Sequence, residues 1–141
     1  MAGDSSLATE LGPSRVRPTV LVVEDEVLIR LLIADELRDL GVQVLEASNA
    51  EEALTILESP LSVHVLFTDI RMPGRMDGIG LSRFAREHYP HLKLLLTSSH
   101  QPENYARASA DVFVSKPYDL NTIVQQAETL LMRSGYELRY R

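Results

Sequence analysis

The chain has 141 residues, of which 45% are hydrophobic and 24% are charged, proportions that are typical of an ordinary soluble globular protein. This length fits one domain and leaves too little for a second folded unit. The sequence contains no cysteine, which excludes disulfides, zinc–thiolate sites and thiol catalysis. The formal net charge of −6 argues against nonspecific binding to nucleic acid, which requires a basic surface.

Residues 1–18 contain Gly, Ser and Pro and lack the apolar segment of a secretory signal, so they predict a flexible N-terminal extension. No apolar run reaches the ~20 residues that a membrane-spanning helix requires. We therefore expect a cytoplasmic protein in which residues 19–133 form the folded domain and residues 134–141 a short C-terminal tail.

Apolar runs alternate along the chain with segments whose apolar residues recur at helical spacing. The runs predicted to be strands are residues 19–23, 42–47, 63–68, 92–96 and 112–115. The segments predicted to be helices are residues 27–40, 79–88, 102–108 and 120–131, together with a helix that ends near residue 58. Ser48-Asn49-Ala50-Glu51 is the predicted capping box of that helix. Gly41 and Gly135 stand where helix C-caps favour glycine, and Asp119 is the predicted N-cap of the last helix.

Strands that alternate with helices predict an α/β fold with a parallel sheet covered on both faces. Because crossover connections are right-handed, the common order for five such units is 2-1-3-4-5, the flavodoxin-like arrangement. In this order the first and third strands are neighbours at the point where the strand order reverses. Their carboxyl ends carry Glu24-Asp25 and Asp69, so these acids are expected to meet at one edge of the sheet.

The run 63–68 delivers one carboxylate, Asp69, to the end of a strand, just before Met72-Pro73 and a glycine-rich turn. Carboxylates that crowd at one edge repel one another and raise one another's pKa values unless a positive group lies among them. Mg²⁺ is the predicted partner, because it takes oxygen ligands, binds through one or two carboxylates and keeps several waters. Acids at strand ends often only solvate a loop, and for Glu24 and Asp25 taken alone that interpretation is the more common one.

Thr97 and Lys116 follow two other predicted strands and bring a hydroxyl and an ammonium to the same edge. Phosphoryl transfer is catalysed mainly by positioning and charge neutralisation, so a cation, an ammonium and a hydroxyl can each cover one phosphoryl oxygen. Asp69 is the predicted phosphoryl acceptor of this set. Taken singly, Thr97 is more often a strand terminus and Lys116 a solvated surface residue. Pro117 allows a cis peptide bond that would direct the lysine inward.

Five motifs follow one another between about residues 19 and 132. They are Val22-Val23-Glu24-Asp25-Glu26, Thr68-Asp69-Ile70-Arg71-Met72-Pro73, Met76-Asp77-Gly78, Leu96-Thr97-Ser98 and Ser115-Lys116-Pro117-Tyr118. In these motifs and their order, the sequence resembles the receiver domains of two-component response regulators. The length of the chain further suggests the stand-alone, single-domain type of response regulator.

This resemblance implies that a histidine kinase or a histidine phosphotransfer protein phosphorylates Asp69. It also implies that Asp25 and Asp69 coordinate Mg²⁺ together with the backbone carbonyl of Arg71, while Glu24 acts largely through water. Mg²⁺ is the expected cofactor, and the expected partners are the phosphodonor and a downstream protein, with no direct contact to nucleic acid or membrane.

The resemblance further implies that Thr97 and Lys116 bind the phosphoryl group and that Phe113 is a switching aromatic. A plain core role for Phe113 is at least as compatible with the sequence. After transfer, Thr97 would move inward and Phe113 would follow, shifting the surface between two states before the acyl phosphate hydrolyses. The phosphorylated protein would then either bind a target or pass its phosphate to another histidine.

Two segments depart from the family pattern. Gly74-Arg75-Met76 makes the loop after Pro73 one residue longer than the common form, downstream of the carbonyl expected on the metal. The stretch between Thr97 and Lys116 is about one helical turn shorter than usual, so the usual dimer or effector face need not carry over.

Three other functions compete with the receiver interpretation. A Mg²⁺-dependent phosphatase with an aspartyl nucleophile would need a second acid at the position of Arg71. A flavodoxin-like cofactor module would need a hydroxyl- and glycine-rich phosphate loop where the chain has Glu24-Asp25-Glu26. A pseudoreceiver that signals by binding alone would not need the complete set of acids, hydroxyl and lysine. We therefore expect a phosphoacceptor switch rather than an enzyme that turns over substrates.

Overall fold

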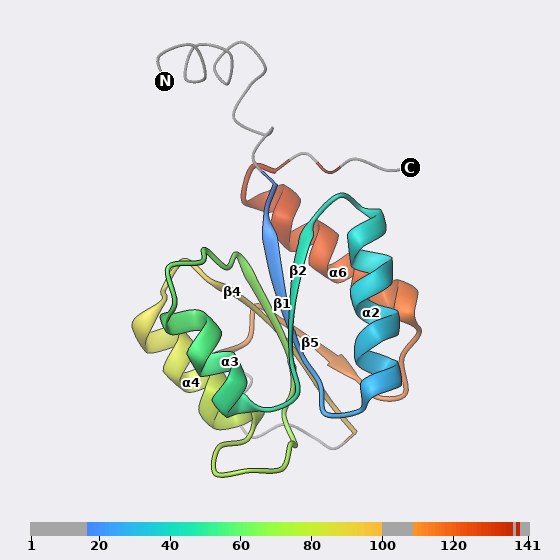
Figure 1. Cartoon of the computed structure of the whole chain (residues 1–141). Coiled ribbons are helices and arrows are strands. Elements are labelled where there is room, and N and C mark those ends of the chain that lie inside the picture. The colour runs from blue at the N-terminus through green and yellow to red at the C-terminus, as the bar shows by residue number, and fades with distance from the viewer. Residues whose placement is uncertain (1–16, 100–108, 137, 139–141) are drawn as a thin grey trace.

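The computed structural model describes residues 17–99, 109–136 and 138, which form a parallel sheet with helices on both faces (Figure 1). The strands are β1 (Thr19–Val23), β2 (Gln43–Ala47), β3 (Val65–Asp69), β4 (Lys93–Ser98) and β5 (Val112–Ser115). The helices are α2 (Val27–Asp39), α3 (Ala50–Glu58), α4 (Gly78–His88) and α6 (Leu120–Arg133). Residues 1–16 of the predicted extension 1–18 and the predicted helix 102–108 lie outside the described residues.

The strand order is β2-β1-β3-β4-β5 and every pairing is parallel, which confirms the predicted sheet. Helices α2 and α6 cover one face, and α3 and α4 cover the other (Figure 1). Along β1, Val20 and Val22 pack in the core layer under α2 and α6, whereas Leu21 and Val23 pack in the layer under α3 and α4. A central strand with apolar partners on both faces needs the continuous apolar run that the sequence shows.

The helix ends follow the predicted chemistry at the two glycines. Asp119 stands at the N-cap of α6 as predicted, but its side chain accepts no N–H of that helix. Gly41 and Gly135 have φ angles of 89° and 93°, in the left-handed region that a glycine C-cap favours. The capping box of α3 lies one residue later than predicted: Asn49 accepts the N–H of Glu52, whose carboxylate accepts the N–H of Ser48. The side chain of Glu51 is thereby free to accept the N–H of Arg75 at 3.0 Å.

Two strands extend further than the apolar pattern predicted. Asp69 is the last residue of β3, and Thr97 lies inside β4 rather than after it. The two residues pair with each other, so the parallel pairing of β3 with β4 continues through them. Backbone pairing does not depend on side-chain polarity, so the strands run on past the last apolar residue. Asp69 and Thr97 are therefore held by the sheet itself at its carboxyl edge.

Among the described residues, no helix combines the length and the apolar character that crossing a membrane would require. The segment after α6 turns back at Gly135, and Tyr136 and Leu138 pack against the core layer beneath α2 and α6. The ring of Tyr136 meets the edge of His64, with 5.1 Å between the ring centroids. His64 in turn accepts the N–H of Thr19 at 2.9 Å, so these contacts close the amino edge of the sheet.

Candidate functional site

The carboxyl edge of the sheet brings together the polar residues that the sequence singled out. Val23 pairs with Thr68, so the next residues, Glu24 and Asp69, leave neighbouring strands at the same level. Asp69 pairs with Thr97 on the other side. Lys116 follows β5 directly, and its backbone N–H donates to the carbonyl of Ser98 at 2.8 Å. Parallel pairing thus gathers residues that are distant in the sequence.

Asp69 is nearly buried at the end of β3, with 6% of its surface exposed. Its Oδ2 accepts a hydrogen bond from the ammonium of Lys116, and the two groups form an ion pair. Its Oδ1 accepts the backbone N–H of Arg71 at 3.1 Å. Both carboxylate oxygens therefore have defined partners, which fix the orientation of the carboxylate.

Lys116 reaches Asp69 from β5, and its peptide bond to Pro117 is cis, as the sequence allowed. Burial acts to lower the pKa of Lys116, but the hydrogen bond and the negative charge of Asp69 outweigh it, so the pKa is raised. The lysine is therefore a fixed positive charge at this edge.

Glu24 is the most deeply buried acid of the edge, with 1% of its surface exposed. Burial raises its pKa from 4.5 to about 7, against the lowering effect of the N–H of Glu26, which donates to Oε2 at 3.0 Å. Oε1 is buried and makes no hydrogen bond with any residue that the structure describes. A buried carboxylate oxygen without a partner is costly, so Glu24 is poised to accept a proton or a cation.

The remaining predicted residues occupy distinct environments. Thr97 is fully buried, and within the described residues its hydroxyl has no hydrogen-bond partner. Asp25 and the side chain of Arg71 are exposed at the rim of the edge. Phe113 is half-buried and packs with Ile70 and Leu96 in a small cluster. The hydroxyl of Thr97 is thus available to a group that enters beside Asp69.

The donor set at the edge fits a magnesium ion. No group of three His, Cys, Asp or Glu side chains in the described part of the chain is gathered closely enough to enclose a metal. The set predicted for Mg²⁺ also draws on a backbone carbonyl, that of Arg71, and Lys116 supplies a positive charge beside Asp69. Mg²⁺ retains waters and needs only one or two carboxylates. The Oε1 of Glu24, which has no partner among the residues that the structure describes, offers such a ligand.

Gly78 permits the close packing of α4 against the end of β3. A Cβ at this position would lie 1.9 Å from the carbonyl oxygen of Asp69, and the N–H of Gly78 donates to the carbonyl of Ile70 at 2.7 Å. The side chain of Asp77 caps α4 by accepting the N–H of Gly80 at 3.0 Å. The first residue of α4 thus packs directly against the end of β3.

Two features of α2 escaped the sequence interpretation. Arg30 donates a hydrogen bond to the backbone carbonyl of Glu24 at 2.9 Å, a contact that the helical spacing of apolar residues does not predict. The first two turns of α2 also expose four large apolar side chains, those of Val27, Leu28, Leu31 and Leu32. These residues lie off the stripe of Ile33 and Leu37 that faces the core, so a helical-wheel comparison would have identified them.

The fold and this edge define an open α/β protein in which a nearly buried aspartate pairs with a half-buried lysine at the carboxyl edge of the sheet. A family model described as the response regulator receiver domain matches residues 20–128, and the chain belongs to this family. Receiver domains act as phosphoacceptor switches in two-component signalling.

Individual relatives agree with this assignment. A putative NtrX-like response regulator from Rickettsia conorii is 35% identical over 111 residues, which cover 74% of this chain but 23% of that protein. The receiver domain of the Francisella response regulator 1452 matches with a TM-score of 0.75 and 22% identity, covering 84% of this chain and 99% of that one. TrrA from Thermotoga maritima, solved in complex with Mg²⁺–BeF, matches with a TM-score of 0.71 and 27% identity, covering 80% and 98%.

The raised pKa of Glu24 predicts a pH-dependent stability in buffer containing a metal chelator. Folding raises this pKa from 4.5 to about 7, so between these values the folded state binds more protons than the unfolded state. The free energy of unfolding should therefore decrease by up to about 3 kcal/mol as the pH rises through this window. Urea titrations of wild type and Glu24→Gln at several pH values measure this, and an identical pH profile for both proteins would contradict it.

Gly78→Ala should destabilise the protein, although alanine is the better helix former. The added Cβ meets the backbone of Asp69 and must displace it, at a cost of about 1–3 kcal/mol. Gly80→Ala is the matched control, because there the nearest atom, at 2.9 Å, is the Cγ of the half-buried Met76 side chain, which can move. Chemical denaturation compares the variants, and equal stabilities for both would show that the contact at Gly78 is unimportant.

Proposed function

We propose that this chain accepts a phosphoryl group on Asp69 in a Mg²⁺-dependent reaction and signals through the change that follows. The observation that carries the proposal is the ion pair between Asp69 and Lys116. It lies beside a buried hydroxyl of Thr97 and a buried oxygen of Glu24, neither of which has a partner among the described residues. Such polar atoms are costly when left unsatisfied, and an entering phosphoryl group with its metal would satisfy them.

The transfer forms a bond between a carboxylate oxygen of Asp69 and phosphorus while the phosphorus–nitrogen bond of the donor phosphohistidine breaks. The ammonium of Lys116, now on Oδ2 of Asp69, moves to a phosphoryl oxygen, and the hydroxyl of Thr97 donates to another. The N–H of Arg71 holds Oδ1 of Asp69 and keeps the carboxylate oriented during attack. Phe113 packs on Leu96, next to Thr97, so a movement of that hydroxyl reaches the surface of β5.

Glu24, Asp25, Asp69 and the carbonyl of Arg71 are the residues proposed to hold Mg²⁺. When bound, Mg²⁺ would neutralise negative charge on the phosphoryl group and the carboxylates. TrrA, which is 27% identical to this chain, was solved in complex with Mg²⁺–BeF, and this supports Mg²⁺ as the proposed cation. Protonation of Glu24 competes with a cation for the same buried oxygen.

Incubation with acetyl phosphate and Mg²⁺, followed by intact-protein mass spectrometry, tests the proposed acceptor. Wild type should gain one phosphoryl group and Asp69→Asn none, because an amide cannot form the acyl phosphate. Lys116→Ala should reach a much lower occupancy, since removal of an electrostatic stabiliser typically costs about 10²–10³ in rate.

Asp77→Asn is the matched control, because it removes a carboxylate from the same edge while asparagine preserves the helix cap. Its phosphorylation should equal that of wild type. Absence of an adduct on wild type, or a full adduct on Asp69→Asn, would refute the proposal. Multiple turnover of a phosphomonoester that depends on Asp69 would instead favour the phosphatase.

The phosphodonor is proposed to dock on the exposed apolar surface of α2, named here the α2 face. It consists of Val27, Leu28, Leu31 and Leu32, and it accounts for four of the six large exposed hydrophobic residues in the described part of the chain. The face begins directly after the acidic end of β1, at the same edge as Asp69. A histidine-bearing helix of a kinase or phosphotransfer protein could cover it and present its phosphohistidine to Asp69.

Leu28→Asp should slow phosphotransfer from a phosphorylated histidine phosphotransfer domain by at least about tenfold, because it places a charge in the proposed contact. Phosphorylation by acetyl phosphate should not change, since the small donor needs no docking. Leu28 is 75% exposed, so the fold should tolerate the change. Leu61→Asp, at a 56% exposed leucine before β3 at the opposite edge, is the control, and equal slowing by both variants would contradict the docking surface.

A further inference from the structure

Arg30 on α2 reaches back to the acidic edge of the sheet. Its Nη1 donates to the backbone carbonyl of Glu24 at 2.9 Å, although the two residues are six apart in the chain. The peptide N–H of Glu24 donates to the carbonyl of Ala47 at 3.0 Å, and its Oε2 accepts the N–H of Glu26. The backbone of Glu24 is thus held from both sides, by β2 and by a charged side chain.

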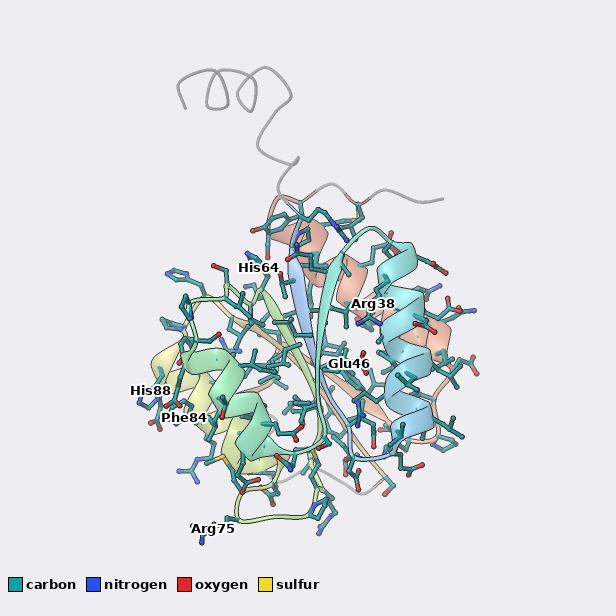
Figure 2. All side chains as sticks on the ribbon, viewed as in Figure 1. Arg38, Glu46, His64, Arg75, Phe84 and His88 are labelled. Atoms are coloured by element: carbon teal, nitrogen blue, oxygen red, sulfur yellow. The ribbon has the colours of Figure 1, made fainter. Side chains whose placement is uncertain are left out.

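Glu46 on β2 holds the guanidinium of Arg30 in place. Its Oε1 accepts from Nε of Arg30 at 3.3 Å, while its Oε2 accepts from Nη2 of Arg38 at 3.0 Å. Figure 2 shows Arg38 and Glu46 facing each other between α2 and the sheet. The side chain of Arg30 is 16% exposed and that of Arg38 is 41% exposed. The better-shielded arginine is therefore the one that contacts the acidic edge.

We propose that Arg30 is a positioning residue of the magnesium site, acting through Glu24. The fork of its guanidinium bridges the carboxylate of Glu46 and the carbonyl of Glu24, which fixes the turn that leads from β1 into α2. This turn carries Asp25 and the Oε1 of Glu24, which has no hydrogen-bond partner in the described part of the chain. The proposal rests on the proposed function of the edge, and it adds a residue outside the acidic set that organises the ligands.

Two physical effects of Arg30 on a bound cation have opposite signs. As a positive charge, Arg30 repels a divalent cation, so its removal would strengthen Mg²⁺ binding. As a positioning residue it orients the ligands, so its removal would weaken Mg²⁺ binding. The sign of the change in affinity therefore distinguishes positioning from simple electrostatics.

Arg38 provides a matched control for this test. Arg38→Gln removes the same charge and the other partner of Glu46. Within the described residues, however, the side-chain hydrogen bonds of Arg38 go to Val44 and Glu46 and not to Glu24. Arg30→Lys retains the charge, but its single ammonium cannot reproduce the fork. The two variants separate loss of charge from loss of geometry.

The experiment measures the Mg²⁺ dissociation constant by calorimetry, and the increase in the midpoint of urea unfolding that Mg²⁺ produces over a chelator. Arg30→Gln should weaken Mg²⁺ binding by about tenfold, as is common for outer-shell partners, and Arg30→Lys by a smaller factor. Arg38→Gln should change the constant by less than about twofold. A general loss of stability would lower the midpoints with and without Mg²⁺ equally, so the difference between them reports on the site.

Unchanged or tighter Mg²⁺ binding by Arg30→Gln, with normal binding by wild type, would overturn the role of Arg30 and leave the proposed function intact. Equal weakening by Arg30→Gln and Arg38→Gln would also overturn it, because the effect would then come from Glu46 alone. If Arg30→Gln does not fold, weakened binding by a folded Arg30→Lys supports the proposal and wild-type affinity refutes it. Absence of Mg²⁺ binding to wild type would count against the metal-dependent function itself.

Discussion

The charge balance between Lys116 and the carboxylates at the carboxyl edge of the sheet is the interaction on which the rest of the site depends. Asp69 is almost buried, and an ionised carboxylate in that position needs a positive partner. Lys116 supplies it from the end of β5, two strands away from β3. The pairing requires that β3, β4 and β5 remain parallel and in register, so the fold and the site share one constraint.

The same edge is left incompletely satisfied. Glu24 and Thr97 each bury an oxygen that has no hydrogen-bond partner among the described residues. In a stable core such atoms are rare, and they lower stability without adding packing. Their presence beside an ion pair of fixed geometry is what favours a site that receives a charged group over one that serves only the fold.

Helix α2 connects this edge to the outside of the molecule in two ways. Its inner side carries Arg30, which links the end of β1 to Glu46 on β2, and its outer side carries the α2 face. The extended loop after β3 adds a second connection, because Glu51 on α3 accepts the N–H of Arg75, whose side chain projects outward in Figure 2. Elements that adjoin the carboxyl edge of the sheet thus also form its accessible surface.

The sequence by itself determined the order of elements and the chemistry of the edge. Apolar runs and helical spacing predicted the sheet, and the acids, hydroxyl and lysine fell at strand ends because polar residues interrupt buried runs. Only the tertiary structure decided that Asp69 and Thr97 lie within their strands, that the capping box of α3 uses Asn49 and Glu52, and that Arg30 contacts Glu24. These features depend on backbone pairing and on contacts between distant segments, which local periodicity does not encode.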